Sequence, residues 1–141
     1  MRSLKTIIAA ALAALLCLGL APASAQTVPV KYLSAATTNA TLVSAGRTKL
    51  GAGVVVNTTT TVYYLKFYNK ATAPTCGTDV PVWTLPIPYG ASNAAGGFVL
   101  PLDGGLLFPL GFGFCLTASI ADSDNTAAAT GLVVNLGVSK Y

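Results

Sequence analysis

The residues after Ala25 contain no stretch in which apolar side chains recur at helical spacing. Short runs rich in β-branched and aromatic residues recur instead about every ten residues, separated by Gly, Pro, Asn and Asp. These runs predict strands over Pro29–Leu33, Ala40–Val43, Gly53–Asn57, Thr61–Asn69, Val80–Ile87, Gly97–Leu102, Leu106–Phe108, Phe112–Ser119 and Gly131–Val138. The pattern predicts an all-β fold, a single antiparallel β-sandwich that is jelly-roll-like and has about eight strands.

The clearest strand is Thr61–Asn69. Alternation divides its side chains into Tyr63, Leu65 and Phe67 on one face and Val62, Tyr64, Lys66 and Tyr68 on the other. Both faces are mostly apolar, which predicts a central strand covered on each side, with Lys66 extending past a tyrosine ring to reach water. The runs Val54–Val56 and Leu132–Val134 are apolar without a break, which is typical of strands in a sandwich core.

Three prolines, Pro81, Pro86 and Pro88, accompany Trp83 in and just after the segment Val80–Ile87. Because proline cannot donate a hydrogen bond to a strand ladder, we expect an edge strand or an irregular stretch here. We interpret Trp83 as an anchor of the hydrophobic core, and a platform for a ligand is the alternative.

The N-terminus has the pattern of a secretory signal peptide. Arg2 and Lys5 supply positive charge, the stretch Thr6–Leu20 is almost entirely apolar, and the small residues of Ala21–Ala25 predict cleavage before Gln26. We therefore expect an exported protein, either periplasmic or extracellular.

Two other interpretations of this N-terminus fit less well. The apolar stretch is shorter than the roughly 20 residues that a membrane anchor needs. A lipoprotein signal would place a small residue before the acylated cysteine, but Leu16 precedes Cys17. We expect residues 1–25 to be the signal peptide and residues 26–141 to form one β-sandwich domain that does not insert into a membrane.

Cys76 and Cys115 are the two cysteines that follow the predicted cleavage site. An even pair in an exported protein predicts a disulfide. The loop that it would close has about 40 residues, so the chain-entropy model gives a stabilisation on the order of 4 kcal/mol. We expect no metal and no cofactor here, because two thiols without histidine supply half of a tetrahedral shell.

The chain has few charges: eight basic and four acidic residues, or 9% charged residues. An ordinary soluble domain has about 25%. The basic residues are scattered, so we expect no nucleic-acid partner. The scarcity of charge indicates that copies of the chain, or a larger assembly, cover much of the surface, which favours a homo-oligomer. A neutral, threonine-rich secreted sandwich is the alternative.

Catalysis is disfavoured because the sequence contains neither histidine nor glutamate. General acid–base chemistry would depend on four aspartates, and no Ser–His–Asp or Cys–His arrangement can form. We therefore predict that the protein is not an enzyme. The cluster Asp122–Asn125 could offer oxygen ligands to Ca²⁺, but the rest of a calcium-binding loop is absent, and turn capping is the simpler role.

Several segments resemble a known group of proteins. These segments are Tyr32–Thr41, Tyr64–Ala71, Ala73–Thr75, Gly77–Pro81, Ala121–Asp124 and Val133–Asn135. Together they resemble small uncharacterised proteins encoded by tailed phages and prophages, which are expected to be β-sandwich structural components of virions. The resemblance implies a sandwich that assembles. This chain departs from the group by its export signal and by its two cysteines.

Our leading hypothesis is a non-enzymatic, exported β-sandwich that acts by self-association or by docking to a surface or a virion-like assembly. The expected contact surface contains Tyr64, Lys66, Tyr68, Phe108, Phe112 and Phe114. The alternative is a secreted module that binds a glycan or another ligand, with or without Ca²⁺. Its expected contacts are Trp83, Tyr89, Asp122, Asp124 and Asn125.

Overall fold

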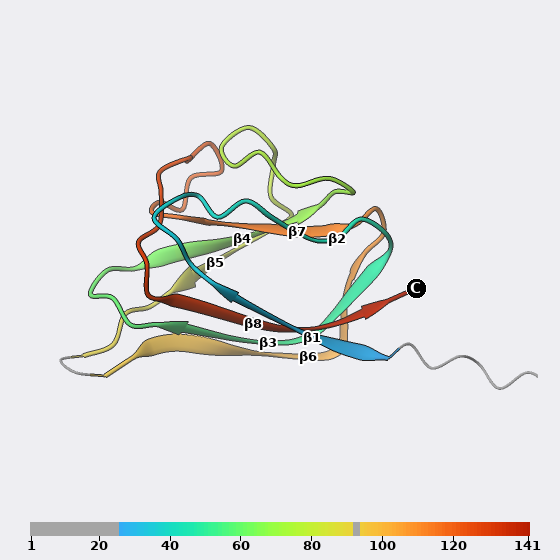
Figure 1. Cartoon of the computed structure of the whole chain (residues 1–141), viewed down its shortest axis with the longest axis horizontal. Helices are drawn as coiled ribbons and strands as arrows, with labels where there is room; N and C mark the ends of the chain where they lie inside the picture. Colours follow the sequence, from blue (N-terminus) through green and yellow to red (C-terminus); the bar gives the residue numbers. More distant parts are fainter. Residues whose placement is uncertain (1–25, 92–93) are drawn as a thin grey trace, which may run out of the picture.

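The computed structural model describes residues 26–91 and 94–141, and the predicted signal peptide lies outside them (Figure 1). The described chain forms eight strands in two four-stranded antiparallel sheets that pack face to face. The strands are β1 (Thr27–Leu33), β2 (Thr41–Ser44), β3 (Thr48–Asn57), β4 (Tyr63–Asn69), β5 (Trp83–Ile87), β6 (Gly96–Phe108), β7 (Phe112–Thr117) and β8 (Leu132–Lys140).

The order of the strands is that of a jelly roll. One sheet has the order β1-β8-β3-β6 and the other the order β2-β7-β4-β5. Strand β1 therefore pairs with β8, β2 with β7, β3 with β6 and β4 with β5, all antiparallel. The chain is thus one long hairpin whose strand pairs alternate between the two sheets, and the predicted jelly-roll-like sandwich is confirmed.

Strand β6 joins two segments that the sequence predicted as separate strands. Its register jumps between the pairs Ala52↔Pro101 and Leu50↔Leu106, so a short stretch of β6 leaves the ladder. Gly104 and Gly105 lie in this stretch with φ angles of 80° and 74°, a left-handed conformation that glycine adopts without strain. The glycines therefore form a bulge within one strand and do not end it.

The hydrophobic core lies between the sheets, and each strand contributes alternate residues to it. In β8 these are Leu132, Val134, Leu136 and Val138, all buried, while the residues between them are half-buried. Phe67 of β4 contacts three other rings, with centroid distances of 5.3 Å to Phe112, 6.3 Å to Phe108 and 6.0 Å to Trp83. The prediction that Trp83 anchors the core is confirmed, since it packs against this cluster.

Strand β4 is a central strand, as predicted, because β7 and β5 flank it. Leu65 and Phe67 face the other sheet and are completely buried. Lys66 and Tyr68 point to the outer face and are buried as well, under loops that cross this sheet.

Replacing the buried Leu65 with alanine should lower the free energy of unfolding by about 2–5 kcal/mol, because the substitution removes apolar contacts and leaves a cavity. The matched substitution Leu110→Ala, at a side chain that is 62% exposed, should change it by less than about 0.5 kcal/mol. Urea unfolding of both variants measures the difference. Equal losses in the two variants would contradict the assignment of the core.

Candidate functional site

Two loops cover the outer face of the β2-β7-β4-β5 sheet (Figure 1). One loop, residues 70–82, connects β4 to β5, and the other, residues 118–131, connects β7 to β8. They touch each other at Gly77, where a side-chain carbon would lie 2.9 Å from the carbonyl oxygen of Ser123 and 2.9 Å from Cβ of Asn125. The two loops therefore form a continuous layer over this sheet.

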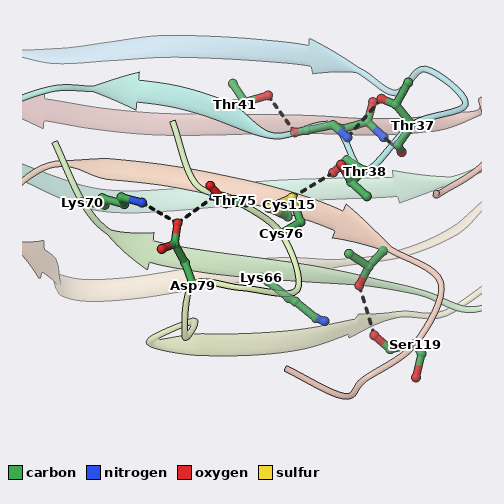
Figure 2. Close-up of a disulfide and its surroundings, with 12 residues drawn as sticks. Thr37, Thr38, Thr41, Lys66, Lys70, Thr75, Cys76, Asp79, Cys115 and Ser119 are labelled. Carbon is green, nitrogen blue, oxygen red and sulfur yellow. Dashed lines mark hydrogen bonds and ion pairs between the residues drawn. A yellow bond between two sulfur atoms is a disulfide. The ribbon is translucent and has the colours of Figure 1, made fainter. Parts of the chain in front are cut away.

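A disulfide attaches this layer to the sheet. Cys76 of the 70–82 loop is bonded to Cys115 of β7, as predicted from the even cysteine pair (Figure 2). Both cysteines are buried, and they pack with Tyr68 into a second, smaller core outside the main one. An oxidising compartment is consistent with this bond.

Lys66 lies under the layer and does not reach water. It is opposite Cys115 in the β4–β7 ladder, its exposed fraction is 0%, and its Nζ donates a hydrogen bond to the carbonyl oxygen of Ala121. Loss of hydration lowers the pKa of its ammonium group, although Asp124 and Asp122 act in the opposite direction. The prediction that Lys66 extends past a tyrosine ring to solvent is wrong, because the 118–131 loop closes over it.

Tyr68 lies against the disulfide on the same face. Its hydroxyl is buried and has no hydrogen-bond partner among the described residues. Burial raises the pKa of Tyr68 to about 12, and the negative charges of Asp79 and Asp122 add to the shift. The surroundings therefore keep the hydroxyl protonated. Because it is buried without a hydrogen-bond partner, it lowers the free energy of unfolding.

The contact surface predicted from the sequence is wrong for five of its six residues. Phe108, Phe112 and Phe114 are at most 1% exposed and belong to the core between the sheets. They lie there because alternate residues of a strand point toward the core, and Phe112 and Phe114, two positions apart in β7, therefore face inward together. Lys66 and Tyr68 are covered by the loop layer, and Tyr64 alone is half-buried.

The carboxylate of Asp124 caps a turn in the acidic loop Asp122–Asn125. Asp124 accepts hydrogen bonds from the backbone N–H of Ser119 (2.8 Å) and of Thr126 (3.2 Å), and from the hydroxyl of Thr126 (2.7 Å). These bonds are those of the predicted capping role. Within residues 26–91 and 94–141, no group of three or more His, Cys, Asp or Glu side chains is arranged to hold a metal ion.

The residues expected to bind a ligand do not lie in one place. Trp83 packs inward against Phe67, while Asp122, Asp124 and Asn125 belong to the loop layer on the outside of the sheet. Tyr89 lies six residues beyond Trp83, which is about 20 Å of extended chain, and lines a different hollow together with Thr59 and Thr60.

Within residues 26–91 and 94–141, no segment covers the outer face of the β1-β8-β3-β6 sheet (Figure 1). Strand pairing places three rows of side chains on this face, Leu33–Val133–Val56–Gly97, Lys31–Asn135–Val54–Val99 and Pro29–Gly137–Ala52–Pro101. We call these twelve residues the bare face. Several apolar members are well exposed to solvent, among them Leu33 (62%), Val99 (66%) and Val54 (43%).

The bare face is slightly hollow at its centre. Gly137 and Ala52 carry little or no side chain, and a shallow depression of about 450 Å³ lies over them. This face is not among the surfaces predicted from the sequence, although the unbroken apolar run Val54–Val56 indicates it. That run places Val55 in the core and its two neighbours outside.

No family model, curated protein or solved structure matches this chain. A helix long and apolar enough to cross a membrane is absent from residues 26–91 and 94–141.

Removing the disulfide by the double substitution Cys76→Ala and Cys115→Ala should lower the free energy of unfolding by about 4 kcal/mol, since the bond links residues separated by 39 positions. Urea unfolding of the variant and of the reduced wild type measures this loss. An unchanged unfolding midpoint after complete reduction would contradict the stabilising role of the bond.

Replacing Tyr68 with phenylalanine should raise the free energy of unfolding by about 1 kcal/mol or more, because the substitution removes a buried hydroxyl without a partner. The wild type should also lose stability as the pH rises from about 10 to about 12, since only its unfolded chain readily releases this proton. Unfolding curves between pH 7 and pH 12 test both effects, with the half-buried Tyr64→Phe as control. A variant less stable than the wild type would refute this description.

Proposed function

We propose that this protein is an exported, non-enzymatic structural module that associates with further copies of itself through the bare face. The observation that supports this proposal is the uncovered apolar surface of the β1-β8-β3-β6 sheet, opposite a second sheet whose outer face is largely covered by the loop layer. Monomeric proteins rarely expose contiguous apolar patches of more than a few hundred Å².

The size of the bare face suits a dimer contact. Four strands at a spacing of about 4.8 Å, with a length of about 30 Å for the nine residues of β8, give the outer face of the whole sheet, of which the bare face is the centre, a planar area of roughly 600 Å². Two copies would then cover roughly 1,200 Å² in total, the lower end of the range for specific interfaces. Two sheets can pack in this way with their strands rotated by about 30°.

The charges on the bare face are compatible with a second copy. Lys31 is its only charged residue, and it lies on β1, an edge strand from which a long side chain can reach solvent at the rim of the interface. No aspartate lies on this face, so association would bury no carboxylate without a partner. A self-complementary apolar centre with a basic rim therefore supports the second copy as the occupant.

Two further observations support a structural role. The chain has only 9% charged residues, fewer than a dispersed monomer needs for colloidal stability. Its resemblance to structural proteins of phages and prophages favours assembly as the task, in the envelope or outside the cell. The lack of histidine and glutamate supports the absence of catalysis.

Substituting Val54 with lysine should abolish the association, because it places a charge at the centre of the bare face without disturbing the core. The matched control is Val80→Lys, at a valine that is 77% exposed in the loop layer, and it should associate like the wild type. Light scattering coupled to size exclusion over a range of concentrations measures the mass of each form.

A wild type that stays monomeric at the highest attainable concentration would overturn the proposal. Association that survives Val54→Lys but is lost in Val80→Lys would assign the contact to the loop layer. Thermal unfolding of both variants shows whether the fold is intact.

A further inference from the structure

A cavity of about 330 Å³ lies at the side of the sandwich formed by β5 and β6. These two strands are the edges of their sheets, and no strand of the described part of the chain pairs with either of them on its free side. Trp83 lines the cavity from β5, Val82 lines it from the end of the 70–82 loop, and Leu102, Leu106 and Phe108 line it from β6. The cavity thus opens an apolar part of the core to the outside, away from the bare face and in contact with the loop layer only at Val82.

The bulge in β6 places a carboxylate at this cavity. Asp103 precedes the two left-handed glycines, in the stretch of β6 that leaves the ladder, and it is exposed while lining the same cavity as Trp83. Among the described residues, the ion pair between Lys70 and Asp79 is the only salt bridge, so Asp103 has no cationic partner there. Bulges beside a binding site commonly redirect a side chain in this way.

We propose that this cavity binds an organic cation with an apolar body, such as an arylammonium or alkylammonium group. The aliphatic and aromatic walls would hold the body, the indole of Trp83 would offer its face to the cation, and Asp103 would supply the opposite charge. The cavity lies at the lower end of the size range of small-molecule sites, which suits a ligand of one ring or one side chain.

The polar groups of the cavity favour such a cation over a sugar. Asp103 and Asn69 are the only lining residues with a polar side chain besides the indole N–H. The carboxamide oxygen of Asn69 already accepts a hydrogen bond from the backbone N–H of Leu110 at 2.9 Å. A sugar would leave several of its hydroxyls without partners in this cavity, and each unpaired buried hydroxyl weakens binding. One cationic group needs only the single carboxylate.

The test uses the single tryptophan of the chain as its reporter. The indole N–H of Trp83 gives one signal in a ¹H–¹⁵N correlation spectrum, and this signal should shift on titration with benzyltrimethylammonium. We expect saturation with a dissociation constant on the order of 1 mM, in line with the small size of the probe. Benzyl alcohol, which has the ring but no charge, should shift it much less, and methyl glucoside should leave it unchanged.

Asp103→Asn should weaken binding of benzyltrimethylammonium about fivefold, because the exposed site loses one charge interaction and keeps its shape. Asp122→Asn, which neutralises an exposed carboxylate of the loop layer, should bind like the wild type. The blocked peptide acetyl-Ala-Lys-Ala-amide, whose one cation is the lysine side chain, is tested in the same way and distinguishes a protein side chain from a free amine as the source of the cation.

Three outcomes would overturn the proposal: a signal of Trp83 that does not move at about 10 mM probe, ten times the expected constant, equal affinity for benzyl alcohol, or equal weakening by Asp122→Asn. The experiment is independent of self-association, because Val54→Lys, used as a monomeric background, leaves the lining of the cavity unchanged.

Discussion

The bond between Cys76 and Cys115 is the constraint on which the asymmetry of this molecule depends. It holds the 70–82 loop against β7, and the 118–131 loop packs against the first one at Gly77. The two loops thereby cover the outer side of the β2-β7-β4-β5 sheet and bury Lys66 and Tyr68 of β4. Within the described residues nothing covers the outer side of the opposite sheet, so only one of the two sheets of the jelly roll is buried on both sides.

This asymmetry explains why apolar residues occur on both faces of several strands. A strand that is buried on both faces of its sheet needs apolar residues on both faces. Strand β4 has them, because the loop layer covers its outer side. Strand β3 also has apolar residues on both faces, and its outer residues Val54 and Val56 lie beside Val133 of β8, but nothing within the described chain covers the outer side of these strands. A second copy would give these strands the cover that the loops give to β4.

The fold was predictable because its signals are local. Alternation, prolines and glycines indicated the strands, and the even cysteine pair indicated the disulfide. The surfaces were not predictable, because they depend on which distant loop lies on which face. Nothing near Lys66 in sequence shows that Ala121 will cover it. Phe112 and Phe114 resemble an exposed pair only until β7 is placed between β2 and β4.

The pairing of β1 with β8 brings Thr27 next to Ser139, and their hydroxyl oxygens are 3.2 Å apart. Both ends of the domain therefore leave from the same corner, as is common in compact domains. A short linker between them would close the backbone into a ring, and new ends could be opened in an exposed loop elsewhere. Circular permutation would thus move the site at which another protein can be fused away from this corner and leave both sheets intact.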